Sequence, residues 1–290
     1  MPFAARLQEL RSDREHGASW MARRAVETLV EVSEEEVGSA YAFLDRLLSA
    51  GRELAGSRPG VGAVEAAVGR LLASVHSTAH LELPELRRLF QEEAEALLDS
   101  RRRAAASIAI QLGPELTDVL VLTHSASATV REALLHTPPE RVFCTVSEPA
   151  GEGRAVARER GEAGIEVELV EDADARETLR HASLFLVGAD TVFRDGTLCN
   201  KAGTHALAQA AADEGVRTIV ASEVIKLAPI AAADAPALTG PGRAHFDFTP
   251  PHLIDEIVTE EGVFEIDELP ALVDRTPFLR EGYALLLGSS

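Results

Sequence analysis

The sequence predicts an α/β protein in which a helical amino-terminal domain, residues 1–112, precedes a domain with a mainly parallel sheet, residues 113–290. Two patterns predict this division. In the first hundred or so positions apolar residues recur at helical spacing, and from Asp118 onward short β-rich runs alternate with helix-length segments. With 290 residues, 46% of them hydrophobic, the chain is long enough to bury a core of this size.

The amino-terminal domain is predicted to be a series of amphipathic helices. Apolar residues between Ala22 and Val30 repeat at helical spacing. Ser33 and Glu36 have the spacing of a capping box, which predicts that the next helix runs from about residue 34 to residue 54. Another helix is expected to end near residue 75, and a long one begins at Pro84.

The second domain alternates strands and helices, as βαβ units do. We predict a Rossmann-like sheet from VLVLTHS (119–125), RVFCTVS (141–147), VELVED (167–172), LFLVGAD (184–190) and RTIVAS (217–222). Such sheets bind ligands beyond the carboxyl ends of their strands. The candidate site residues are therefore those that end or follow the runs, namely Ser125, Ser147, Glu148, Asp190, Glu223 and Lys226.

The charge balance excludes several kinds of partner. Forty-seven acidic residues against 28 basic ones give a net charge of −19, which opposes direct binding to nucleic acid. The basic run at residues 101–103 lies in a helical pattern and is interpreted as a solvated helix face. Because the sequence has neither about twenty consecutive apolar residues nor a signal-peptide pattern, we expect a cytoplasmic protein without membrane association.

Lysine is rare in this chain, which has 26 Arg but only two Lys, Lys201 and Lys226. An acidic, Lys-poor composition predicts adaptation to high salt, although biased codon usage also depletes lysine. Cys144 and Cys199 lack CxxC spacing and are predicted to be reduced and buried. Two histidines at i,i+4 spacing have no third ligand, so we predict no metal site and no cofactor.

Asp190 ends one predicted strand and precedes a turn at residues 195–196 and a helix that opens near residues 200–204. A helix amino terminus beside Lys201 and small residues is a favourable site for an anion. A lone aspartate after a strand is by default a turn or capping residue. The neighbours of Asp190 favour the other interpretation, in which its carboxylate faces a phosphate pocket.

Five segments follow one another in a specific order: LTHSASATVREAL (122–134), SEPAGEGRAVA (147–157), VGAD with NKAGT (187–204), ASE with Lys226 (221–226), and FDFTPPHLIDEIVTEEG (246–262). HGASWMARRAVETL (16–29) and SRPGVGAV (57–64) add weaker similarity. Together they resemble the family that joins the regulatory alpha, beta and delta subunits of translation initiation factor 2B to methylthioribose-1-phosphate isomerase and ribose-1,5-bisphosphate isomerase. The resemblance covers nearly the whole chain.

This resemblance implies roles for the site residues. Asp190 corresponds to the acid–base carboxylate, Asn200 and Lys201 to residues that contact the substrate, and Lys226 to a phosphate ligand. An ammonium and a guanidinium are not equivalent phosphate ligands, which explains why lysine is kept at these two positions. The resemblance also implies a phosphorylated sugar or nucleotide as ligand, a homo-oligomer of at least two chains, and a translation-factor protein partner.

One departure from the isomerases concerns proton transfer. The isomerases resemble LTHC at the end of the first strand, where this chain has Ser125. A cysteine supplies a thiolate near neutral pH, whereas a serine hydroxyl needs an adjacent base. His124 is not expected to be that base, because consecutive strand residues point to opposite faces.

A second departure concerns phosphate binding. The isomerases resemble RGAG in the amino-terminal domain, with an arginine near the phosphate, where this chain reads His16-Gly17-Ala18-Ser19. A fixed positive charge is thereby replaced by a titratable one. The segment 147–157 also lacks an arginine of the isomerases, and we expect Arg154 to reach the pocket in its place.

Two functions agree with these features. Ser125 and His16 favour a non-catalytic, factor 2B-like regulatory protein that binds a phosphorylated sugar or nucleotide in an isomerase-derived pocket. Asp190, Asn200, Lys201 and Lys226 favour an aldose–ketose isomerase in which Ser125 or a water replaces the thiol. A structural subunit with an empty pocket would leave the two lysines unexplained.

Overall fold

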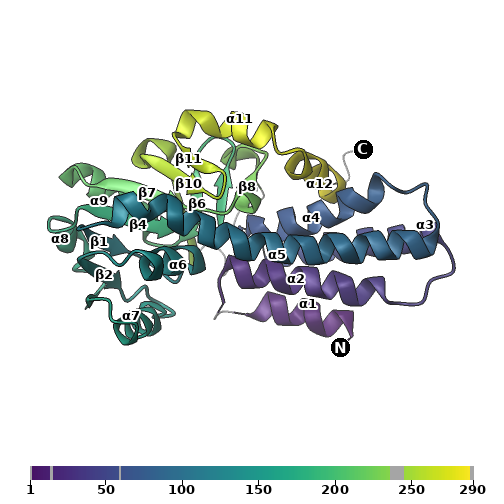
Figure 1. Ribbon diagram of the computed structural model, residues 1–290, viewed down its shortest axis with the longest axis horizontal. Helices are drawn as coiled ribbons and strands as arrows, with labels where there is room; N and C mark the ends of the chain where they lie inside the picture. The colour runs from purple at the N-terminus through teal and green to yellow at the C-terminus, as the bar shows by residue number, and fades with distance from the viewer. Residues whose placement is uncertain (1, 14–15, 59, 236–244, 288–290) are drawn as a thin grey trace.

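The computed structural model describes residues 2–13, 16–58, 60–235 and 245–287, which form a helical part and a sheet part (Figure 1). The helical part contains α1 (Phe3–Ser12), α2 (Ala18–Ser33), α3 (Ala40–Ala55), α4 (Gly62–His76) and α5 (Leu83–Leu116). Their apolar faces share one core, which includes Leu29, Leu47 and Phe90. The predicted helical amino-terminal region is confirmed. Among the described helices, none is long and apolar enough to span a bilayer.

The predicted capping box at Ser33 is wrong. Ser33 is the last residue of α2, and its buried hydroxyl donates a hydrogen bond to the Val30 carbonyl at 2.7 Å. The next helix, α3, has Ser39 as its N-cap, and the Ser39 hydroxyl accepts a hydrogen bond from the Ala42 N–H at 3.1 Å. The segment contains two serines that are each competent to cap a helix, and the second one does so.

Helix α5 belongs to both parts of the molecule (Figure 1). Leu86 and Phe90 near its start pack in the helical core, whereas Ile108 and Leu112 near its end pack against the sheet. The boundary predicted between residues 112 and 113 therefore falls inside a continuous helix.

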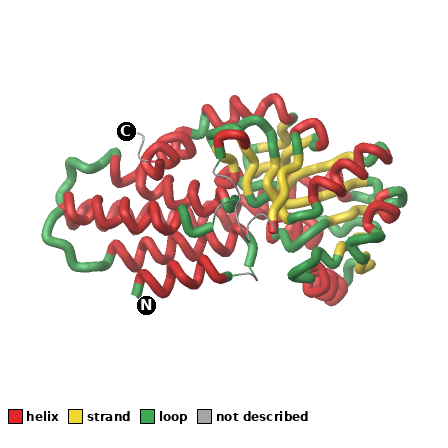
Figure 2. Tube along the Cα trace, turned by 180° about the vertical axis from the view of Figure 1, so that it is seen from behind, coloured by secondary structure: helices red, strands yellow, loops and turns green. Residues whose placement is uncertain are grey.

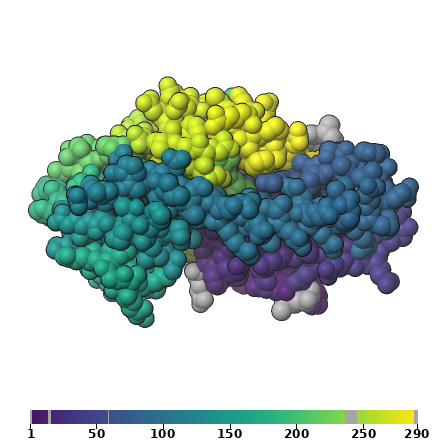
Figure 3. Space-filling model, viewed as in Figure 1, coloured from purple at the N-terminus to yellow at the C-terminus, as the bar shows by residue number. Residues whose placement is uncertain are grey.

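The carboxyl terminus returns to the helical part. Helix α12 (Pro277–Leu287) lies against α4, where a Cβ added to Gly69 would lie 2.8 Å from the Gly282 Cα. Two glycines thus allow the backbones to touch. Figure 3 shows the carboxyl-terminal segment lying along both parts of the molecule.

The predicted, mainly parallel sheet is confirmed (Figure 2). It contains β1 (Leu120–Thr123), β2 (Arg141–Thr145), β3 (Val167–Val170), β4 (Leu184–Gly188), β7 (Arg217–Ala221), β10 (Glu256–Thr259) and the antiparallel β11 (Gly262–Phe264). The order is β11-β10-β7-β4-β1-β2-β3. From β1 the chain continues to β2 and β3 on one side of the sheet, and from β4 it continues to β7 and β10 on the other side. The topological switch point therefore lies between β1 and β4. Ser125 follows β1 and Asp190 follows β4.

Helices flank the strands of this sheet. They are α6 (Ala128–His136), α7 (Gly153–Glu162), α8 (Ala175–Leu179), α9 (Thr204–Glu214) and α11 (Leu269–Asp274). Apolar side chains between these helices and the strands form two further cores. The rigid sheet that results fixes the positions of the residues at its carboxyl-terminal edge.

The sequence did not predict a second, smaller sheet. It contains β5 (Thr191–Phe193), β6 (Leu198–Lys201), β8 (Leu227–Ala228) and β9 (Phe246–Thr249), in the order β8-β5-β6-β9. Strands β5 and β6 form a hairpin whose turn contains Gly196, with φ of 81°, where a turn is predicted. The hairpin carries Asn200 and Lys201 back toward the end of β4.

Candidate functional site

A cavity of about 220 Å³ lies beside the switch point, between the sheet part and the helical part. The structure brings most of the sequence-predicted site residues to its lining, namely His16, Gly17, Ala18, Ser125, Asp190, Asn200, Lys201 and Lys226. Arg154 is not among the described residues that line it. The Arg154 side chain is 51% exposed, and its guanidinium lies 3.9 Å from Glu148 and 3.7 Å from Glu171.

Asp190 stands at the joint between the two sheets. Its backbone N–H donates to the Cys199 carbonyl at 3.1 Å, which fixes the residue between β4 and the hairpin. Burial raises the pKa of the Asp190 carboxyl to about 6, although the positive charges of Lys226, Arg58 and Lys201 act in the opposite direction. A carboxyl that gains and loses a proton close to neutral pH is suited to general acid–base chemistry.

Ser125 has a carboxylate beside it. Its backbone is left-handed, with φ of 68°, and its N–H donates to the Ser147 hydroxyl at 2.8 Å. The Ser125 hydroxyl donates to a Glu152 carboxylate oxygen at 2.8 Å. Sequence reasoning considered only His124 as a base for Ser125 and missed Glu152. The only signal in the sequence was that Glu152 belongs to a segment similar to the family. Its contact with Ser125 could not be predicted, because that contact depends on how the β2–α7 connection folds.

His124 is occupied by other partners. Its Nε2 lies 3.0 Å from the Ala202 carbonyl, which can only accept, so Nε2 carries the proton. Its Nδ1 then accepts from the Thr145 hydroxyl at 2.7 Å. Burial lowers the pKa of His124, despite the opposing hydrogen bond to Ala202. The neutral ring thus braces β1 against β2 and the β6–α9 connection.

Lys201 forms an ion pair within the cavity. Its ammonium donates to both carboxylate oxygens of Glu152, at 2.7 and 2.9 Å. Glu152 therefore accepts hydrogen bonds from Lys201 and Ser125 together. Next to Lys201, the buried Asn200 amide donates to the Thr204 hydroxyl at 3.1 Å, which joins β6 to the start of α9.

Lys226 is paired with a carboxylate behind the cavity wall. It ends a short 3₁₀ helix (Val224–Lys226), and its ammonium lies 3.9 Å from Glu223. Burial lowers the pKa of Lys226, while the negative charges of Glu223 and Asp190 oppose that shift. The side chains of Lys226 and Glu223 are 4% and 5% exposed, so this ion pair is almost fully removed from water.

Glu223 also joins the site to the helical part. It accepts hydrogen bonds from the Ser19 hydroxyl at 2.8 Å and from Arg101 Nε at 3.0 Å. Burial raises the pKa of Glu223, but the charges of Arg101 and Lys226 outweigh it, and the net effect lowers the pKa. The interpretation of residues 101–103 as a solvated face is wrong for Arg101, which is 10% exposed, although Arg102 is 77% exposed.

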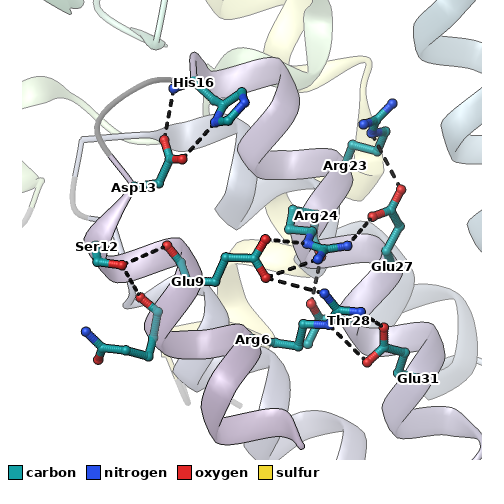
Figure 4. A network of polar contacts seen from close by, with 11 residues as sticks. Arg6, Glu9, Ser12, Asp13, His16, Arg23, Arg24, Glu27, Thr28 and Glu31 are labelled. Atoms are coloured by element: carbon teal, nitrogen blue, oxygen red, sulfur yellow. Dashed lines mark hydrogen bonds and ion pairs between the residues drawn. The ribbon is translucent and has the colours of Figure 1, made fainter. Parts of the chain in front are cut away.

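His16 and Arg58 enter the cavity from the helical part and are both tied to Asp13. The Asp13 carboxylate accepts from the His16 N–H at 2.9 Å and lies 2.7 Å from His16 Nδ1 (Figure 4). Arg58 donates to the Asp13 carbonyl at 2.6 Å. The His16 ring stacks on Trp20, with ring centroids 4.0 Å apart. The sequence placed Arg58 in the weakly similar segment SRPGVGAV without giving it a role, so this cation of the site was missed.

Ion pairs attach α1 to α2 close to His16. Figure 4 shows Arg24 between Glu9 and Glu27, and Arg6 beside Glu31. The Arg24 guanidinium lies 3.1 Å from Glu9 and 3.0 Å from Glu27. These pairs hold α1 against α2.

The helix amino terminus predicted as an anion site is already capped. Asp247 on β9 accepts hydrogen bonds from the Gly203 N–H at 2.7 Å and the His205 N–H at 3.3 Å, at the start of α9. The amino terminus that opens into the cavity is instead that of α2, whose N-cap Gly17 has no side chain to cap it. The first turn of a helix favours an anion there.

Cysteine and metal chemistry have little support in the part of the chain that the structure describes. Cys144 and Cys199 are both buried and unpaired, as predicted. Within the described residues, no group of three or more His, Cys, Asp or Glu side chains has the geometry to hold a metal.

Comparison with known proteins gives a consistent set of relatives. The family model described as Initiation factor 2 subunit family matches residues 14–239. A Pyrococcus horikoshii protein described as translation initiation factor eIF-2B subunit 2-like is 32% identical, over 89% of this chain and 94% of that one. Ribose 1,5-bisphosphate isomerase of Haloferax volcanii is 28% identical, over 89% and 87%. The crystal structure of Pyrococcus horikoshii translation initiation factor eIF-2B aligns with a TM-score of 0.78 and 28% identity, over 91% of this chain and 98% of that one.

Proposed function

Because the chain belongs to the Initiation factor 2 subunit family, we propose that it binds a phosphorylated sugar or nucleotide in this cavity and acts as an initiation factor 2B-like regulatory protein. The observation that carries this proposal is the convergence of Arg58, Lys201 and Lys226 on one small cavity. Charged donors and the open first turn of α2 are the groups that recognise phosphate. Asp190 faces the same space and is available to a ligand hydroxyl.

Ser125 supports a regulatory role over efficient turnover. A hydroxyl loses its proton far less readily than a thiol, and loss of a proton-transfer group typically costs about a hundredfold or more in rate. His16, in place of a permanently charged arginine, weakens the hold on a phosphate. Both changes are tolerable in a protein that needs only to sense its ligand.

A second candidate function is aldose–ketose isomerisation of a ribose 1-phosphate derivative, favoured by the hydrogen bond between Ser125 and Glu152. Isomerisation requires one group to remove a proton from one carbon and another to assist the neighbouring oxygen. Asp190, with its pKa raised to about 6, and Glu152, paired with Lys201, are two carboxyls in different environments. Such pairs are typical of acid–base sites.

We further propose that the protein is a homo-oligomer of at least two chains and that its regulatory role requires a translation-factor protein partner. Two exposed apolar residues support the first part. Val263 on β11 is 46% exposed and Ile110 on α5 is 63% exposed, and these two elements touch. Light scattering after size-exclusion chromatography measures the mass directly, and a monomer would contradict the proposal.

The decisive experiment separates binding from turnover. Purified protein is screened by thermal shift with ribose 1,5-bisphosphate, methylthioribose 1-phosphate and nucleoside monophosphates, and each binder is then assayed for ketose formation. Binding without turnover supports the regulatory function. Efficient turnover that is lost in Asp190→Asn establishes the isomerase, and no stabilisation by any of these compounds contradicts ligand binding in the cavity.

A further inference from the structure

The two lysines of the cavity are neutralised in different ways. The counter-ion of Lys226 is Glu223, which is held behind the wall by Arg101 and Ser19 and is not among the described lining residues. The counter-ion of Lys201 is Glu152, which itself lines the cavity and is 21% exposed. Asp190 also lines the cavity and its charge acts on Lys226, but the carboxylate that pairs with Lys226 lies outside the lining. A ligand next to Lys201 instead meets an ammonium that is hydrogen-bonded to a lining carboxylate.

We propose that Glu152 makes the Lys201 side of the cavity a hydroxyl-binding subsite, so that the cavity selects ligands with one phosphoryl group over ligands with two. This inference rests on the proposed function and names the ligand class of the same site. The phosphoryl group is placed on the Lys226 side, with Arg58 and the first turn of α2. The sugar hydroxyls are placed beside Glu152.

The chemistry of the second subsite follows from its hydrogen bonds. Glu152 accepts from Ser125 at 2.8 Å and from Lys201 at 2.7 and 2.9 Å, and a carboxylate retains further acceptor capacity for a ligand hydroxyl. At neutral pH the oxygens of a phosphoryl group act only as hydrogen-bond acceptors. A phosphoryl group therefore competes with Glu152 for the Lys201 ammonium and is repelled by the Glu152 carboxylate. Glu152 is 21% exposed, so solvent screens this repulsion only in part.

The test compares two ligands that differ in one phosphoryl group, ribose 1-phosphate and ribose 1,5-bisphosphate, by isothermal titration calorimetry on the full chain. In the wild type we expect the monophosphate to bind about tenfold more tightly or better, because the second phosphoryl group meets Glu152. Glu152→Gln keeps the size and the hydrogen bonding but removes the charge. In this variant we expect the two ligands to bind about equally, or the bisphosphate to bind more tightly. The reason is that Lys201 becomes free to bind the second phosphoryl group.

Two variants control the experiment. Glu171→Gln removes an exposed carboxylate next to Arg154, outside the cavity, and should leave the ratio unchanged. Glu152→Ala also removes the charge and should shift the ratio as Glu152→Gln does. It serves as the test if the Glu152→Gln variant fails to fold. Tighter binding of the bisphosphate by the wild type, or a ratio unchanged in both Glu152 variants, overturns this inference but leaves the proposed function intact. Binding of neither compound also overturns this inference, whereas the proposed function is contradicted only if the whole thermal-shift screen finds no binder.

Discussion

The Lys226 ammonium lies 3.9 Å from a carboxylate oxygen of Glu223, and both side chains are at most 5% exposed. The same carboxylate accepts hydrogen bonds from Arg101 on α5 and Ser19 on α2. One buried anion thus pairs with two cations and connects the cavity to two helices of the amino-terminal part. The position of Lys226 therefore depends on how the two parts of the molecule are joined.

Replacing Glu223 by alanine should be strongly destabilising. Arg101 and Lys226 would remain buried without their counter-charge, and breaking a buried ion pair by removing one partner costs about 3–5 kcal/mol. Urea unfolding measured by circular dichroism gives the change in free energy. The control is Glu35→Ala, which removes a 43% exposed partner of Arg46 and should cost about 1 kcal/mol or less. Equal losses in the two variants would contradict the predicted importance of burial.

Asp190 should make a pH-dependent contribution to stability. Its pKa in the folded protein is about 6, above the ordinary value for aspartate of about 3.9. Between these values the folded protein binds more protons at this group than the unfolded chain does, so stability falls as pH rises through the window, and the loss persists above it. Asp190→Asn removes that loss.

We therefore expect Asp190→Asn to stabilise the protein at pH 7.5 and to have about a third of that effect at pH 4.5. A shift of about two pKa units corresponds to about 3 kcal/mol, and because the carboxyl is partly exposed to the cavity we expect a gain of about 1–2 kcal/mol. Urea unfolding curves for both proteins at both pH values measure it. The same difference at the two pH values would show that titration of Asp190 is not its cause.

Patterns of local residues predicted the parallel sheet well. The strands around Leu122, Phe143 and Phe185 are short apolar runs bounded by turns, and each of them lies in the sheet. Ser125 and Asp190 were then found because they follow strands, and the carboxyl ends of parallel strands meet at one edge of the sheet.

Contacts between distant segments could not be predicted in the same way. Glu152 reaches Ser125 only through the fold of the β2–α7 connection, and Arg58 reaches the cavity only because the helical part packs against the sheet edge. Asp247 is 44 residues from Gly203 and 42 residues from His205, the two residues whose N–H groups it caps. Its role therefore depended on the second sheet, whose short strands carry little apolar pattern. Composition gave no indication that Arg101 differs from Arg102.

Stability should rise from low to molar KCl. A net charge of −19 implies self-repulsion in the folded state, which counter-ions screen. Salt also weakens exposed ion pairs such as Arg24 with Glu27, but each such pair contributes only about 0–1 kcal/mol. Thermal unfolding midpoints across the salt series measure the balance, with sucrose at equal osmolality as the control. Midpoints that stay constant or fall would contradict salt adaptation.

Ser125→Cys should raise isomerase activity from a low or absent level, by about tenfold or more, while Asp190→Asn abolishes whatever activity exists. With its first carbon phosphorylated, the substrate has no free aldehyde, so ring opening and proton transfer between neighbouring carbons need two groups of complementary protonation. Asp190, with its pKa raised to about 6, is able to supply one of these groups. The Ser125 hydroxyl contributes mainly its hydrogen bond to Glu152.

A thiol at position 125 would meet two opposing influences. The nearby Lys201 ammonium favours the thiolate, whereas the Glu152 carboxylate disfavours it. The double variant Ser125→Cys with Glu152→Gln should therefore be more active than Ser125→Cys alone. A coupled ketose-phosphate assay with methylthioribose 1-phosphate and ribose 1,5-bisphosphate tests both variants, with Ser125→Ala as the control for loss of the hydroxyl. Full wild-type turnover that persists in Ser125→Ala would overturn the regulatory function and show that another group, with Glu152 as the first candidate, carries the proton.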